Sequence, residues 1–147
     1  MSKDSIVILS ARRTPVGAFQ GAFASVKATE LGTAAIRGAL ESSGLSPADI
    51  QEVIMGCVLP AGLGQGPARQ AALGAGIPNT TPATTVNKLC GSAMKAIMMA
   101  ADSLRTGDID VAVAGGLESM TNAPYLLLKA RSGYRMGHGE ILDHMFY

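Results

Sequence analysis

The chain has 147 residues, of which 48% are hydrophobic and 16% are charged, a composition typical of a globular domain with a substantial core. The 12 lysines and arginines nearly balance the 11 aspartates and glutamates, so a net charge of +1 gives no indication of a nucleic-acid or membrane partner. The two cysteines, Cys57 and Cys90, lie far apart without histidines at metal-binding intervals, which argues against a disulfide framework or a zinc site.

The first residues contain an early acidic side chain and only a short apolar run, unlike a signal or transit peptide. No stretch approaches the ~18 apolar residues of a membrane span. The sequence therefore predicts a cytoplasmic protein without a membrane partner. A buried strand is expected over residues 5–10, where the apolar run ends at Arg12 and Arg13.

An amphipathic helix is predicted over residues 29–43, because apolar side chains recur there at helical spacing before Gly44. A second strand is expected over residues 50–59. The loop after it contains the closely spaced glycines Gly62, Gly64 and Gly66. A phosphate-binding loop is one interpretation, but no Lys-Ser/Thr pair follows, so a tight connecting loop is favoured.

A short helix is expected from Pro67 through residue 75, since proline suits the first turn of a helix. Residues 83–89 are predicted to form a third strand. The helix expected over residues 90–105 is apolar nearly all round, which is typical of a central helix covered on most sides. A fourth strand is expected over residues 110–115.

Four strands alternating with three helices predict an α/β fold, a mostly parallel sheet with helices on both faces. We expect residues 1–120 to form this α/β domain. Residues 121–147 are richer in loop-forming and charged residues and are expected to begin a separate region.

Cys90 occupies the predicted junction between a strand and a helix, followed by Gly91, Ser92 and Ala93. Unpaired N–H groups and the positive end of the helix dipole favour a thiolate at such a position, and small neighbours leave room for a substrate carbonyl. This layout suits covalent acyl transfer. Because cysteine is also a frequent core residue, inert packing remains the alternative on local pattern alone.

Other residues offer weaker candidates for a site. His138 and His144 lie in polar sequence, and solvated loop positions are favoured over a catalytic role. Cys57 lies within an apolar strand and is expected in the core. Glu118 and Ser119 follow a predicted strand at the edge where ligands often bind in α/β sheets, so they are candidates for shaping a site.

Three basic side chains lie near these segments. Lys88 and Lys95 flank Cys90 and could stabilise a thiolate by proximity, although helical spacing directs Lys95 elsewhere and a structural role is favoured for it. Arg69 is expected to form an ion pair on a helix surface rather than to bind substrate.

Four ordered blocks of the chain resemble the thiolases, the acetyl-CoA acetyltransferases and 3-ketoacyl-CoA thiolases. The blocks are residues 6–17 (IVILSARRTPVG), 62–71 (GLGQGPARQA), 86–92 (VNKLCGS) and 114–125, which contains AGGLESMT and APY. The block around Cys90 resembles the thiolase acylation site more than the equivalent segment of the related ketoacyl-carrier-protein synthases.

The resemblance implies that Cys90 is the nucleophile that carries an acyl group as a thioester. It implies acyl transfer between coenzyme A thioesters in fatty acid metabolism, with coenzyme A and acyl-CoA as substrates and no permanently bound cofactor or metal. It also implies homodimers, formed by pairing of the strand that precedes the nucleophile, or homotetramers.

The thiolase segments Gly-His-Pro, Cys-x-Gly-Gly-Gly and Asn-Glu-Ala-Phe, which carry the family's acid and base groups, do not occur in this sequence. We therefore expect the chain to correspond to the N-terminal portion of a thiolase, truncated in its loop domain and inactive alone. Two interpretations follow. The chain supplies Cys90 to an active thiolase, or it is a catalytically incomplete fragment that serves only in folding or association.

Overall fold

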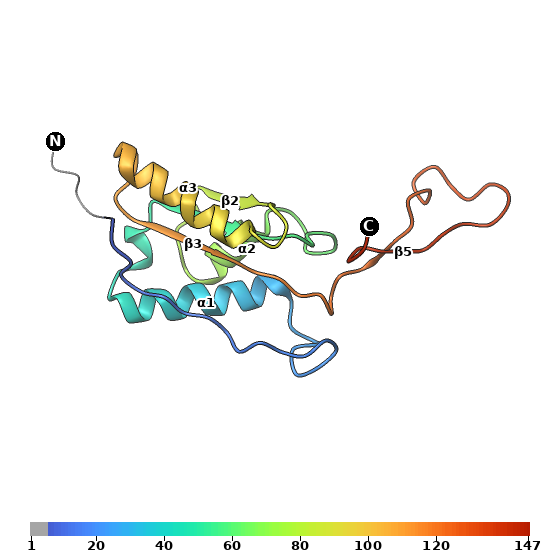
Figure 1. The fold of residues 1–147 in the computed structure, drawn as a ribbon, viewed down its shortest axis with the longest axis horizontal. Coiled ribbons are helices and arrows are strands. Elements are labelled where there is room, and N and C mark those ends of the chain that lie inside the picture. Colours follow the sequence, from blue (N-terminus) through green and yellow to red (C-terminus); the bar gives the residue numbers. More distant parts are fainter. Residues whose placement is uncertain (1–5) are drawn as a thin grey trace.

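The computed structural model describes residues 6–147, and Figure 1 shows an α/β body from which a long arm extends. We use "body" for residues 28–117 and "arm" for residues 125–143. The described helices are α1 (Ala28–Ser43), η1 (Pro47–Asp49, a 3₁₀ turn), α2 (Pro67–Gly74) and α3 (Ser92–Thr106). The described strands are β1 (Glu52–Gly56), β2 (Ala83–Val86), β3 (Ala112–Gly116), β4 (Tyr125–Leu126) and β5 (Leu142–Asp143).

The body is built on a parallel sheet with the strand order β2-β1-β3. Successive side chains of β1 point to opposite faces, as strand geometry requires. Val53 and Met55 pack in a core cluster with residues of α1 and α2, whereas Ile54 packs with Ala96 and Ala100 of α3. Helices therefore cover both faces of a parallel sheet, which confirms the predicted fold class.

Local signals account for the bounds of α1 and α2. At the start of α1, the Glu30 carboxylate accepts a hydrogen bond from the Lys27 N–H at 2.8 Å, and Gly44 ends the helix with φ of 75°. Pro67 opens α2, where the Ala68 N–H donates to Thr85 Oγ1 at 3.0 Å. Both helices lie where the sequence predicted them, within one residue at each end.

The first turn of α3 lies directly on the ends of two strands. A Cβ atom added at Gly56 would come within 2.6 Å of the Ala93 backbone nitrogen, and one at Gly116 within 2.9 Å of the Ala93 Cβ. Such distances exclude any side chain unless the helix moves. The two glycines thus set how closely the segment after Cys90 approaches the sheet.

The strand predicted over residues 5–10 is not found. Ser5 lies outside the described residues, and residues 6–10 form neither a helix nor a strand. Ile8 has 83% of its surface exposed, and none of the three strands of the described sheet pairs with residues 6–10. An extended segment needs a hydrogen-bonded neighbour to become part of a sheet, which explains the difference.

Two expectations about α3 also need correction. The helix begins at Ser92 rather than at Cys90. Its apolar residues are not covered on most sides, because Met94 is 69% exposed and Ile97 and Met98 are also exposed. One face of α3 packs on the sheet while the opposite face lies at the surface of this chain.

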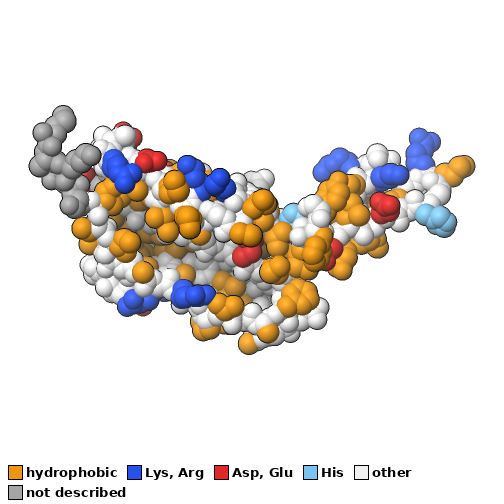
Figure 2. Space-filling view, viewed as in Figure 1, with side chains coloured by type: hydrophobic (Ala, Val, Ile, Leu, Met, Phe, Trp, Pro, Cys, Tyr) orange, Lys and Arg blue, Asp and Glu red, His pale blue; other side chains and the backbone are white. Residues whose placement is uncertain are grey.

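The arm leaves the body after β3 and carries the two-residue strands β4 and β5, which pair in an antiparallel ladder (Figure 1). Figure 2 shows hydrophobic side chains at the surface of both the body and the arm. Within residues 6–147, none of the helices has the length and apolar character needed to cross a bilayer.

Candidate functional site

The carboxyl ends of the three parallel strands meet at one edge of the sheet. Val58 and Leu59 follow β1, the turn of residues 87–91 follows β2, and Glu118 follows β3. Open α/β sheets commonly bind ligands at this edge, because the loops there are free to carry functional groups on a rigid support. The predicted candidates Cys90 and Glu118 both lie here.

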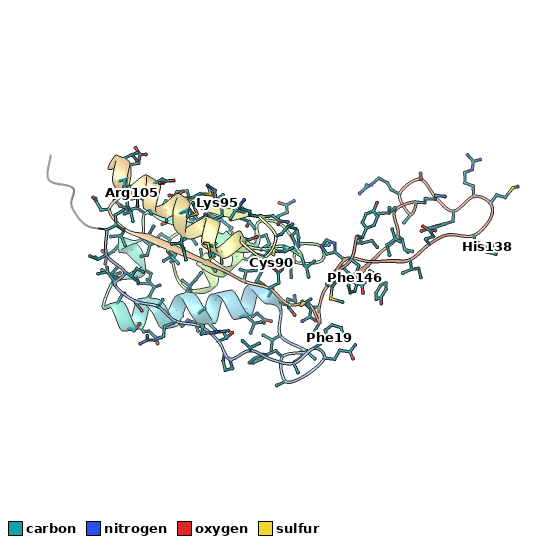
Figure 3. The ribbon with its side chains drawn as sticks, in the orientation of Figure 1. Phe19, Cys90, Lys95, Arg105, His138 and Phe146 are labelled. Carbon is teal, nitrogen blue, oxygen red and sulfur yellow. The ribbon has the colours of Figure 1, made fainter. Side chains whose placement is uncertain are left out.

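Cys90 is an exposed free thiol in the turn between β2 and α3, immediately before the N-cap residue Gly91 (Figure 3). Leu89, the residue before it, has φ of 49°. A leucine in the left-handed region costs roughly 1–2 kcal/mol, so neighbouring contacts must hold this conformation. A strained backbone beside an exposed thiol is typical of a functional turn and is not expected of core packing.

Hydrogen bonds within the turn restrain its backbone. The Gly91 N–H donates to the Lys88 carbonyl at 3.1 Å, and the Ser92 N–H donates to the Leu89 carbonyl at 3.0 Å. The buried Ser92 hydroxyl accepts from the Lys88 N–H at 2.8 Å and donates to the Leu89 carbonyl at 2.6 Å. The sequence suggested that Ser92 merely leaves space for a substrate, whereas its side chain is an internal support of the turn.

Asn87 is a member of the site that sequence reasoning missed. Its Oδ1 accepts a hydrogen bond from the Leu89 N–H at 2.9 Å, and its Nδ2 donates to the Val58 carbonyl at 3.3 Å. Asparagine commonly bonds the backbone two residues onward in turns, so an Asn between a strand and Lys-Leu-Cys was an available signal. The contact with Val58, in contrast, has no local signature.

Glu118 holds the loop that follows β1. Its carboxylate accepts hydrogen bonds from the Val58 and Leu59 N–H groups, both at 2.9 Å, and lies 3.6 Å from Cys57 Sγ. Glu118 therefore acts as a structural clamp between two strand ends, a role that sequence reasoning left unassigned.

Cys57 lies in the core, as predicted, with 1% of its surface exposed. Burial, reinforced by the charge and hydrogen bond of Glu118, raises the pKa of the Cys57 thiol to about 12. This thiol is therefore protonated and inaccessible at neutral pH, which leaves Cys90 as the exposed cysteine of the chain.

The two histidines do not join Cys90. His138 lies near the far end of the arm in Figure 3, well away from Cys90, and is exposed as predicted. His144 is half-buried rather than solvated, and its Nε2 accepts a hydrogen bond from the Ala61 N–H at 3.4 Å. Within the described residues, neither imidazole is hydrogen-bonded to the Cys90 thiol.

The basic residues near the site have structural contacts. Arg69 does not form the predicted ion pair, since its guanidinium donates to the backbone carbonyls of Thr81 at 3.1 Å and Asn79 at 2.8 Å. It thereby tethers the segment that enters β2. Lys95 lies on α3, one turn beyond Cys90, and its backbone N–H donates to the Gly91 carbonyl at 2.9 Å (Figure 3).

The glycine-rich loop before α2 is a tight connection, as predicted. Gly62, Gly64 and Gly66 all have positive φ values. The Gln70 side chain donates to the carbonyls of Leu63 at 2.7 Å and Gln65 at 2.9 Å, so a residue of α2 closes the loop from inside.

Two cavities lie away from the Cys90 turn. One of about 210 Å³ lies between α1 and the end of β3, where Arg12, Arg13 and Glu118 contribute to its lining. Another of about 250 Å³ lies in the arm and is lined partly by Tyr134 and His138. Cys90 lines neither of these two cavities, and its thiol is exposed. Residues 6–147 contain no group of three side chains placed to hold a metal ion.

Comparisons with known proteins show the family to which the chain belongs. Residues 6–147 match the family model described as thiolase, N-terminal domain. Acetyl-CoA acetyltransferase 2 of Arabidopsis thaliana is 54% identical over 140 residues, which are 95% of this chain and 35% of that protein. The acetyl-CoA acetyltransferase of Pseudomonas aeruginosa is 53% identical over 142 residues, which are 97% of this chain and 36% of that protein.

A mitochondrial acetyl-CoA acetyltransferase of Mus musculus is 56% identical over 131 residues, which are 89% of this chain and 31% of that protein. The chain thus spans about a third of the length of these relatives. The family match extends over nearly every residue, from the segment before α1 through the arm. This chain belongs to the thiolase family and corresponds to its N-terminal domain.

Proposed function

We propose that this chain supplies the nucleophile of an acyltransferase that acts on coenzyme A thioesters, with Cys90 as that nucleophile. The observation that carries the proposal is the exposed Cys90 thiol on a strained turn at the carboxyl ends of the strands. The relatives are named acetyl-CoA acetyltransferases, which supports coenzyme A thioesters as substrates of the complete protein.

In the proposed reaction, the Cys90 thiolate attacks the keto carbon of a 3-ketoacyl-CoA. The bond between the keto carbon and the carbon next to the thioester carbonyl breaks. The acyl group stays on Cys90 as a thioester, and the departing acetyl-CoA carbanion takes up a proton. The thiol of coenzyme A then attacks the thioester, which releases a shortened acyl-CoA and the Cys90 thiol. Coenzyme A is therefore a substrate, and no resident cofactor enters the scheme.

The acid and base for these steps are expected from parts of the protein outside this chain. His138 lies on the arm, away from Cys90, and the His144 Nε2 accepts from the backbone at Ala61. Glu118 is engaged by two backbone N–H groups and the Cys57 thiol. In this proposal the described residues supply the nucleophile, while proton transfer requires further groups.

Differential alkylation tests whether Cys90 is the reactive thiol. Limiting iodoacetamide, followed by peptide mass spectrometry, should label Cys90 before Cys57 in the folded chain, because the Cys57 thiol is buried and protonated. The same reaction in urea should label both cysteines and serves as the control. Faster labelling of Cys57 in the folded chain would contradict the proposal.

Acyl transfer itself is tested in the protein that continues beyond these residues. The DNA downstream should encode, in frame, a Gly-His-Pro and a Cys-x-Gly-Gly-Gly segment. Radiolabelled acetyl-CoA should then label the Cys90 peptide of that protein, and Cys90→Ala should abolish labelling while Cys57→Ala retains it. Absence of both segments would favour the alternative, a fragment that serves only in folding or association.

A further inference from the structure

The conformation of Leu89 requires an explanation that its own side chain does not provide. Leu89 has φ of 49°, yet 70% of its surface is exposed. Side-chain burial therefore does little to compensate for the roughly 1–2 kcal/mol that a left-handed leucine costs. Polar contacts to the backbone of the turn must therefore stabilise the left-handed conformation of Leu89. The same contacts then fix the orientation of the adjacent Cys90.

The side chain of Asn87 holds the N–H of Leu89. The bond from the Leu89 N–H to Asn87 Oδ1, at 2.9 Å, closes an Asx turn immediately before Cys90. The same side chain reaches out of the turn, because Asn87 Nδ2 donates to the Val58 carbonyl at 3.3 Å. Asn87 thus connects the Cys90 turn to the loop that follows a different strand.

The group that Asn87 contacts is itself fixed. The N–H of Val58 donates to Glu118 Oε2 at 2.9 Å, and the Leu59 N–H donates to Glu118 Oε1 at the same distance. Glu118 follows β3, so the chain of contacts runs from β3 through the β1 loop to Asn87. The Val58 carbonyl that accepts from the Asn87 amide is therefore held in place by Glu118, not by the turn that carries Cys90.

We propose that Asn87 is a positioning residue for Cys90. This inference rests on the proposed function of Cys90 as the acyl acceptor. Asn87 holds Leu89 in its left-handed conformation and thereby sets the alignment of Cys90 Sγ with the acyl carbon that it attacks. Without the Asn87 side chain, Leu89 relaxes towards negative φ and Cys90 moves away from that alignment.

Two reagents separate positioning from mere access to the thiol. Iodoacetamide alkylation needs an accessible thiolate and forms no oxyanion. Acylation by p-nitrophenyl acetate forms a thioester at Cys90, breaks the ester bond and releases p-nitrophenolate through a tetrahedral oxyanion. Loss of alignment should slow acylation much more than alkylation, because misplacement by about 1 Å can cost as much as about 100-fold.

The experiment compares Asn87→Ala, Asn87→Ser and the double variant Asn87→Ala/Leu89→Gly with the wild type, and Cys90→Ala provides the blank. Asn87→Ala should slow acylation about 10-fold or more while alkylation changes less than about 3-fold. Serine retains an acceptor for the Leu89 N–H and should restore part of the rate. Glycine adopts positive φ without the hydrogen bond from Asn87, so the double variant should also recover part of the acylation rate.

The outcomes are distinguishable. If Cys90 in Asn87→Ala is acylated at the wild-type rate, the positioning role alone is overturned. The same holds if acylation and alkylation are slowed equally and neither rate recovers in the serine and glycine variants. A wild-type Cys90 that is acylated no faster than a cysteine in a short peptide would overturn this inference, whereas the proposed function is decided separately by acetyl labelling of the Cys90 peptide in the complete protein. Urea unfolding of each variant identifies any loss of rate that follows from loss of folded protein.

Discussion

The Glu118 carboxylate accepts a hydrogen bond from the Val58 N–H at 2.9 Å, and this contact joins the end of β3 to the loop after β1. The two residues are 60 positions apart in the chain. On its other side, Val58 is joined through its carbonyl to Asn87 in the turn that carries Cys90. The three strand ends beneath the candidate site are therefore connected by polar side chains as well as by the sheet.

Replacing Glu118 should destabilise the body. Glu118→Gln keeps the size of the side chain but places an amide NH₂ among backbone N–H groups that require acceptors. Because hydrogen bonds to charged groups contribute about 1.5–3 kcal/mol, we expect a loss of that order in the free energy of unfolding measured with urea. Glu41→Gln, at an exposed position of α1, is the matched control and should change it by less than about 0.5 kcal/mol. Equal losses in the free energy of unfolding for Glu118→Gln and Glu41→Gln would contradict the role of Glu118 as a structural clamp.

The buried Cys57 thiol should make stability fall in alkaline solution. Burial raises its pKa from 9.0 to about 12 in the folded protein. Above pH 9 the unfolded chain releases this proton while the folded chain retains it, so the free energy of unfolding falls by up to about 1.4 kcal/mol per pH unit until the folded pKa is reached. Below pH 9 both states keep the proton and this contribution is constant.

Urea unfolding of the wild type and of Cys57→Ala, measured on both sides of pH 9, checks this dependence. The alanine variant retains every other titrating group, so the difference between the two curves isolates Cys57. We expect the wild type to lose stability more steeply than Cys57→Ala in the alkaline range. Parallel curves would show that the Cys57 thiol titrates alike in the folded and unfolded chains.

The 147-residue chain alone should show negligible thiolysis of acetoacetyl-CoA. Neither described histidine is bonded to Cys90, and removal of the partner groups of a nucleophile leaves only a small residual rate in dissected enzymes. The assay follows consumption of acetoacetyl-CoA by the chain and by Cys90→Ala. A rate that depends on Cys90 and approaches that of an intact thiolase would show that the chain holds its own acid and base.

We expect the chain to form dimers or larger species through β2, whose outer edge has no neighbouring strand in the described sheet. The carbonyls of Pro82 and Val86 accept from β1, so by alternation the N–H and C=O of Thr85 point to the open edge. Thr85→Pro should weaken association in sedimentation equilibrium, because proline removes that donor.

Thr85→Ala is the control for this change, since Thr85 Oγ1 also accepts from the Ala68 N–H at the start of α2. Both variants lose that bond, but alanine retains the backbone donor and should retain association. A folded wild-type monomer at tens of micromolar, or undiminished pairing of Thr85→Pro, would reject the interface.

Several features could be predicted because their causes are local. The amphipathic spacing before Gly44 predicted α1, and Pro67 predicted the start of α2. The apolar run around Cys57 predicted a buried strand, and four short blocks, of which the segment around Cys90 is one, together placed the chain in its family. In each case a few consecutive residues carry the signal.

Other features depended on contacts between distant segments. Residues 6–10 have the composition of a strand but pair with none of the described strands, so composition alone predicted a strand that is absent. Asn87 and Val58 are 29 positions apart, and their hydrogen bond exists because parallel strands bring their carboxyl ends to one edge. A long-range polar contact has no sequence periodicity to reveal it, which is why the support of the Cys90 turn became visible only in three dimensions.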